Sequence, residues 1–182
     1  NVCRVLNDGI DSTVISAMVG VATSGVFTNY VALRQYVVNI IRTVLDPLTA
    51  SVGNLCAVES TEKKETFFNH LQFTCFWIYG FSAIGLWIVS DHFIAGVWLH
   101  STGWLLPADC VLFYALNLAI EGMAKAVIIY RDANGLFWQT KYRYIFSSVF
   151  NAVFSIVLVG PAGLGVTGAL IGTTASLVIM LS

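Results

Sequence analysis

Charge is what this sequence has least of. Only 10% of its 182 residues are Asp, Glu, Lys or Arg, whereas 57% are hydrophobic. An ordinary soluble domain carries roughly a quarter charged residues, so this composition excludes a soluble globular domain. The same apolar excess excludes a disordered chain. The formal net charge is -1, which gives no electrostatic reason to expect nucleic acid as a partner.

Signatures of catalysis and of metal binding are missing as well. The sequence contains no P-loop, no G-x-S-x-G nucleophile elbow and no H-E-x-x-H zinc motif. Its four cysteines, Cys3, Cys56, Cys75 and Cys110, stand far apart. This spacing favours small buried hydrophobes over a disulfide framework or a zinc site. We therefore predict that the protein is not an enzyme, and that it has no catalytic residues, cofactor or metal.

One apparent nucleotide-binding motif has a simpler interpretation. The string Gly163-Leu-Gly165-Val-Thr-Gly168 matches G-x-G-x-x-G letter by letter, but that motif binds dinucleotides only between a strand and a helix of a βαβ unit. Here it joins two apolar stretches. Gly168 and Gly172 form a G-x-x-x-G pair, which favours close packing of helices in a bilayer.

Long apolar stretches recur along the whole chain. A membrane span needs about 20 mostly apolar residues, and continuous runs without alternation indicate helices and not barrel strands. We predict an all-α polytopic transmembrane bundle across residues 1–182. Its spans lie at about residues 5–19, 21–45, 67–89, 105–129, 144–159 and 166–181. Because apolar stretches run up to both ends, we interpret the chain as an internal piece of a longer membrane protein.

Basic residues are distributed unevenly among the links between spans. The link at residues 56–66 holds Lys63 and Lys64, and the link between the fourth and fifth spans holds Arg131, Lys141 and Arg143. The links at residues 20–24, 91–104 and 160–165 hold no Lys or Arg. The positive-inside rule therefore places the basic links in the cytoplasm and the others outside. Three tryptophans fit interfacial belts, on the outer side Trp98 and Trp104 and on the inner side Trp138.

The second span carries charges that are costly inside a membrane. Arg34 lies near its middle, and Arg42 and Asp46 lie near its inner end. Arg42 and Asp46 are four residues apart and can pair, or Arg42 can reach the interface. For Arg34, we expect it to line a polar cavity, with an ion pair to another helix as the alternative.

The fourth span carries one polar stripe. Asn117, Glu121 and Lys125 follow each other at four-residue spacing, three residues after Tyr114, so they share one face of the helix. Either Glu121 and Lys125 neutralise each other, or they face the same cavity as Arg34, where Glu121 is a proton or cation site. In the first span, Asp11 is interpreted equally as a helix cap or as an ion-coupling residue.

Several strings resemble a known transporter family. They are Asp11-Ser-Thr-Val-Ile-Ser16 with Gly25-Val-Phe-Thr-Asn-Tyr30, Ser51-Val-Gly-Asn-Leu55, Arg131-Asp-Ala-Asn-Gly-Leu-Phe-Trp138, and Asn151, Ser155 and the stretch 165–173. In this order they resemble the second lobe of bacterial O-antigen and capsular polysaccharide flippases. These are Wzx-type members of the multidrug/oligosaccharidyl-lipid/polysaccharide exporter superfamily.

This resemblance implies a function for the chain. It implies a two-lobed bundle in the bacterial cytoplasmic (inner) membrane that moves an undecaprenyl-diphosphate-linked oligosaccharide to the outer leaflet by alternating access. The implied partners are the lipid-linked oligosaccharide, membrane lipid and a missing N-terminal lobe of the same chain. Arg131, Asp132, Gly135 and Trp138 match the family's inner link.

From position alone, we predict two groups of site residues. The substrate-binding residues are Arg34, Arg42, Asn117 and Lys125, and the ion-coupling residues are Glu121, Asp11 and Asp46. Two alternatives stay open, a multidrug or organic cation antiporter of the same superfamily and a membrane-embedded glycan polymerase.

Overall fold

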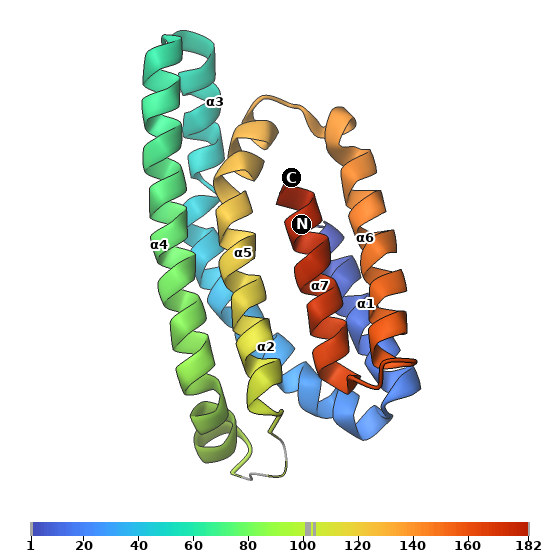
Figure 1. Cartoon of the computed structure of the whole chain (residues 1–182). Helices are drawn as coiled ribbons and strands as arrows, with labels where there is room; N and C mark the ends of the chain where they lie inside the picture. Colours follow the sequence, from blue (N-terminus) through green and yellow to red (C-terminus); the bar gives the residue numbers. More distant parts are fainter. Residues whose placement is uncertain (1, 101–102, 104, 182) are drawn as a thin grey trace.

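The computed structural model describes residues 2–100, 103 and 105–181, and helices account for most of them (Figure 1). No strand occurs among these residues, so the prediction of an all-α fold is confirmed. Along the chain the helices are α1 (Val2–Met18), α2 (Val21–Leu45), α3 (Leu48–Val58), α4 (Thr61–Phe93), the short π-helix η1 (Ile94–Trp98), α5 (Ala108–Ala133), α6 (Phe137–Val159) and α7 (Gly165–Leu181).

The links with basic residues are shorter than predicted. Helix α3 extends to Val58 and α4 begins at Thr61, so only residues 59–60 connect them, and Lys63 and Lys64 lie on a helix. Glu and Lys are good helix formers, and the backbone hydrogen bonds of α4 therefore continue beyond its apolar stretch. Hydropathy marks only the apolar part of a helix, which is why the sequence placed these residues in a loop.

The same correction applies at the link between α5 and α6. Arg131 and Asp132 form part of the last turn of α5, and α6 already begins at Phe137. Only residues 134–136 connect the two helices, with Gly135 at a φ of 69°. A left-handed residue just past a helix end is the usual way to stop a helix, and glycine adopts it without steric cost. Arg143 therefore lies on α6 and not in the link.

The predicted outer link at residues 91–104 also starts later. Helix α4 includes Asp91, and η1 extends the helical path to Trp98. Trp104 lies outside the described residues.

Glycines set the closest helix contacts. A Cβ on Gly168 would lie 2.8 Å from the backbone carbon of Leu158, and one on Gly172 would lie 2.7 Å from Oγ of Ser155. Both distances are shorter than real Cβ contacts, so α7 packs on α6 only because these positions lack a side chain. The prediction that the G-x-x-x-G pair packs helices is confirmed. The G-x-G-x-x-G string begins in the α6–α7 link and ends in the first turn of α7, so it follows a helix and not a strand.

The links gather at opposite ends of the bundle (Figure 1). The α3–α4 and α5–α6 links share one end, and the α1–α2, α4–α5 and α6–α7 links share the other. The two links predicted to be cytoplasmic therefore lie on the same side. Helices α4 and α5 pack together, as do α6 and α7, and α5 joins the two pairs by packing on α7.

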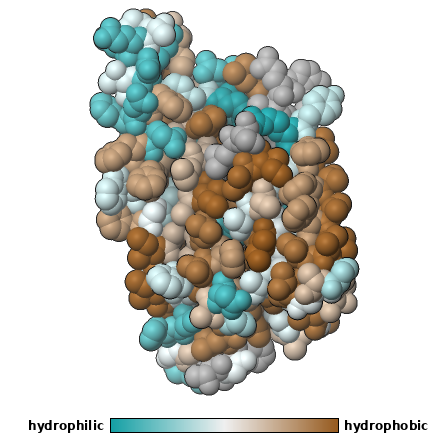
Figure 2. Space-filling model, in the orientation of Figure 1, coloured by the Kyte–Doolittle hydropathy of each residue, from teal (hydrophilic) through white to brown (hydrophobic). Residues whose placement is uncertain are grey.

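Two helical segments are long and apolar enough to cross a membrane by length and composition, Thr61–Trp98 and Ala108–Ala133. Shorter apolar stretches cover Ile145–Val159 and Gly165–Met180. Figure 2 shows hydrophobic residues over the middle of one face, with hydrophilic residues gathered at the α3–α4 end. This surface is compatible with a membrane protein.

Candidate functional site

Arg34 of α2 makes an ion pair with α5. Its guanidinium Nη2 lies 2.6 Å from Oε2 of Glu121, and Arg34 is 5% exposed. The guanidinium carbon also lies 5.4 Å from the centre of the Tyr114 ring, within the range of a cation–π contact. Of the two alternatives for Arg34, the ion pair to another helix is the arrangement observed.

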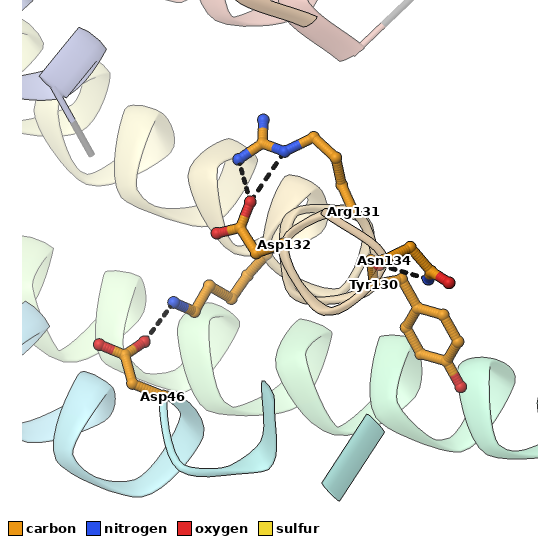
Figure 3. A network of polar contacts seen from close by, with 6 residues as sticks. Asp46, Tyr130, Arg131, Asp132 and Asn134 are labelled. Atoms are coloured by element: carbon orange, nitrogen blue, oxygen red, sulfur yellow. Dashed lines mark hydrogen bonds and ion pairs between the residues drawn. The ribbon is translucent and has the colours of Figure 1, made fainter. Parts of the chain in front are cut away.

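Lys125, one helical turn beyond Glu121, pairs with α2 in the same way. Its Nζ lies 2.6 Å from Oδ1 of Asp46 (Figure 3). The expected pairing of Arg42 with Asp46 is therefore wrong, and so is the alternative in which Glu121 neutralises Lys125. Arg34 lies on α2 and Asp46 directly follows the end of that helix, so Glu121 and Lys125 find their partners across the bundle and not at i,i+4 on α5.

Asn117 extends this stripe toward α7. Its Nδ2 donates to the carbonyl of Leu170 at 3.2 Å, and its Oδ1 accepts from Oγ1 of Thr174 at 2.7 Å. The predicted stripe on α5 therefore does face the interior of the bundle. Asn117, Arg34 and Lys125 are buried, and the structure gives each of them a partner inside the chain.

Asp11 lies in a second buried polar cluster, on the other side of the bundle. It belongs to the interior of α1 and is 1% exposed, so the prediction of a helix cap is wrong. Oγ1 of Thr173 on α7 donates to one carboxylate oxygen at 2.6 Å, and Oγ of Ser155 on α6 donates to the other at 3.4 Å. Three helices therefore converge on one carboxylate.

An amide oxygen in this cluster lacks a donor. Nδ2 of Asn151 donates to Oγ1 of Thr173 at 2.7 Å, whereas its Oδ1 is buried and has no hydrogen-bond partner in the described structure. A buried unsatisfied oxygen costs about 1–3 kcal/mol. Asp11, Ser155, Thr173 and Oδ1 of Asn151 contribute oxygen atoms to this cluster, the ligand type that hard cations prefer.

The sequence had not singled out Asn151, Ser155 and Thr173 as site residues. A signal was present, since Ser147, Asn151 and Ser155 follow at four-residue spacing on the apolar helix α6 and all three are buried. No group of three or more His, Cys, Asp or Glu residues that could hold a metal occurs in the described part of the chain.

The residues of the family-type inner link make contacts of their own at the C-terminal end of α5, in the same close-up view as the ion pair of Asp46 (Figure 3). Arg131 donates to the carboxylate of Asp132 beside it, and Nδ2 of Asn134 donates to the carbonyl of Tyr130 at 2.7 Å (Figure 3). These contacts close the C-terminal end of α5, where a basic residue also stabilises the helix dipole. The side chain of Trp138 lies outside the described residues. A stabilising role at the helix end accounts for the contacts of Arg131, Asp132 and Asn134.

In comparisons with known proteins, no family model, no curated protein and no solved structure matches this chain. The resemblance to polysaccharide flippases therefore stays a prediction.

Proposed function

We propose that the chain is one lobe of a multi-pass transporter in the bacterial cytoplasmic membrane that flips a lipid-linked oligosaccharide between leaflets. The observation that carries this proposal is the pair of ion pairs between α2 and α5, Arg34 with Glu121 and Lys125 with Asp46. Charged residues inside membrane segments are expensive and mark substrate or ion pathways by default. A purely structural membrane subunit would leave three such groups unexplained, namely Arg34, Glu121 and Lys125.

In each pair, the basic side chain can exchange its carboxylate partner for an anionic ligand. Asp46 is the exposed partner of Lys125, with 52% of its side chain accessible. A diphosphate that reaches this edge can compete with the carboxylate, because phosphate oxygens are strong acceptors for Lys and Arg. Release of Asp46 or Glu121 upon substrate entry would then couple binding to a movement of α2 relative to α5. A preceding lobe of the same chain would supply the other wall of the pathway.

The test removes the charge of one partner of the ion pair at a time in the full-length protein and compares the two variants. Purified protein in liposomes is assayed for movement of undecaprenyl-diphosphate-linked oligosaccharide, with wild type beside Arg34→Gln and Glu121→Gln. If Arg34 binds the anionic head group, Arg34→Gln stops movement, whereas Glu121→Gln preserves substrate binding. Equal losses in both variants, with equal drops in melting temperature, would mean that the pair serves only the fold.

A cation antiporter is the second candidate, and the Asp11 cluster is the observation that favours it. A buried carboxylate beside an unsatisfied amide oxygen suits a coupling cation or proton. The same liposomes are therefore assayed for organic cation efflux under a Na⁺ or a proton gradient, with Asp11→Asn and, as control, Thr13→Ala on the exposed side of α1. Cation efflux without glycolipid movement would replace the flippase proposal with this one.

A further inference from the structure

Helix α2 presents a polar row on its outward side, partly exposed in the described structure. Thr28 and Asn39 are exposed, and Gln35 and Arg42 are half-buried. The intervals between these residues are seven, four and three positions, so they follow one line along the helix. Nε2 of Gln35 donates to Oδ1 of Asn39 at 2.5 Å, which joins the two amides in the central part of a 25-residue helix.

This row contrasts with the exposed faces of α4 after Thr74 and of α6 after Arg143. The exposed residues there include Phe81 and Trp87 on α4, and Phe146 and Val153 on α6. Such faces suit lipid chains. Primary amides facing hydrocarbon would lose their hydrogen bonds to water, at a cost of several kcal/mol each. The row on α2 therefore faces water or a polar ligand.

The residues beside the polar row are apolar. Tyr36, Ile40 and Val44 lie beside it, and each is more than 60% exposed. The outward side of α2 is thus divided lengthwise into a polar row and an apolar flank. A ligand with a hydroxylated part and a hydrocarbon part would match both.

The chemistry of the row selects one kind of ligand. Asn and Gln each carry two N–H donors and one carbonyl acceptor without charge. The hydroxyl of Thr28 donates to the carbonyl of Ser24 at 2.9 Å, so its oxygen is left as an acceptor. Sugar hydroxyls both donate and accept, so they match this set. Arg42 lies at the inner end of the row, and no ion pair is recorded for it among the described residues. One anionic group at that end would complement it.

We infer that Thr28, Gln35 and Asn39 form a carbohydrate subsite, which binds the hydroxyl-rich part of a ligand whose anionic group lies at Arg42. This inference rests on the proposed function and adds to it. The buried ion pairs of Arg34 and Lys125 do not reach this row, so sugar recognition is assigned to neutral side chains. The row extends over about 16 Å between Thr28 and Asn39 at 1.5 Å per residue, which accommodates a chain of sugars and not a single ring.

The test measures binding of two probes to the full-length protein. The probes are undecaprenyl diphosphate carrying an oligosaccharide and the same lipid diphosphate without sugar. Asn39→Leu is compared with wild type and with the control Ile88→Leu on α4, where Ile88 is 58% exposed and lies outside the row and its flank. Loss of one or two neutral hydrogen bonds predicts about a tenfold rise in Kd for the sugar-bearing probe, with no change for the bare lipid diphosphate or in the control.

Each other outcome is informative. Equal weakening of both probes, or no weakening of either, overturns the carbohydrate subsite while the flippase proposal stands. If wild type binds neither probe, the proposed function fails and the subsite fails with it. Accessibility is checked separately with Asn39→Cys in a background with its native cysteines changed to alanine. If a charged thiol reagent does not label it, another part of the protein covers the row and the inference is wrong.

Discussion

Arg34 and Glu121 are 87 positions apart in the sequence, yet their charged atoms lie 2.6 Å apart between α2 and α5. Neither side chain is more than 15% exposed. A pair of this kind is weak evidence for stability by itself, because desolvation of both charges offsets most of their attraction. Removing one partner is a different matter, since it leaves the other charge buried alone.

This difference predicts an asymmetry between single and double variants. Glu121→Gln should destabilise the protein by about 3–5 kcal/mol, whereas Arg34→Met combined with Glu121→Leu should recover most of that loss. Thermal melting of the purified protein in detergent measures both. A double variant as unstable as the single one would show that the pair itself stabilises the fold.

The contact between α6 and α7 depends on a missing side chain. Gly168→Ala places a methyl group against the backbone of Leu158, which cannot move as a flexible side chain does. We expect a loss of about 1–3 kcal/mol from overpacking. The matched control is Gly85→Ala on α4, where a Cβ meets no atom within 4 Å. If both variants melt at the same temperature, α7 does not pack on α6 as closely as described.

Tyr30 connects three segments at the end of the bundle opposite the basic links. Its hydroxyl donates to Oδ1 of Asp91 at 2.6 Å and accepts from the amide N–H of Leu106 at 3.1 Å. Tyr30→Phe removes both bonds, and a hydrogen bond to a charged group contributes about 1.5–3 kcal/mol. The control is Tyr36→Phe on the same helix, where the side chain is 63% exposed. Melting curves should separate the two variants, and equal curves would argue against this contact.

The orientation of the bundle gives a prediction about labelling. Cysteines introduced at Lys63 and at Leu164 lie at opposite ends (Figure 1). In intact cells that express the protein, an impermeant thiol reagent should label Leu164→Cys and spare Lys63→Cys, because the positive-inside rule predicts a cytoplasmic position for the basic end. Labelling of Lys63→Cys from outside would reverse the orientation.

Much of the secondary structure followed from local pattern. The predicted span at residues 21–45 has the bounds of α2, and the stripe of Asn117, Glu121 and Lys125 does face the interior. The extra helix α3 and the early starts of α4 and α6 escaped prediction. Hydropathy reports which residues are apolar, whereas helical hydrogen bonding continues through Glu, Lys and Gln wherever no residue interrupts it.

The partners of the buried charges were decided by the tertiary structure alone. Sequence spacing paired Arg42 with Asp46, but Asp46 pairs with Lys125, 79 positions away. Likewise, Asp11 meets Thr173 across 162 positions. The apolar composition and the helical period by themselves determined that these charged residues would lie on helices. They also determined that few polar side chains nearby could pair with them. Which helix faces which depends on close approaches such as that of Gly168 to Leu158, a property of the packed bundle that no local pattern contains.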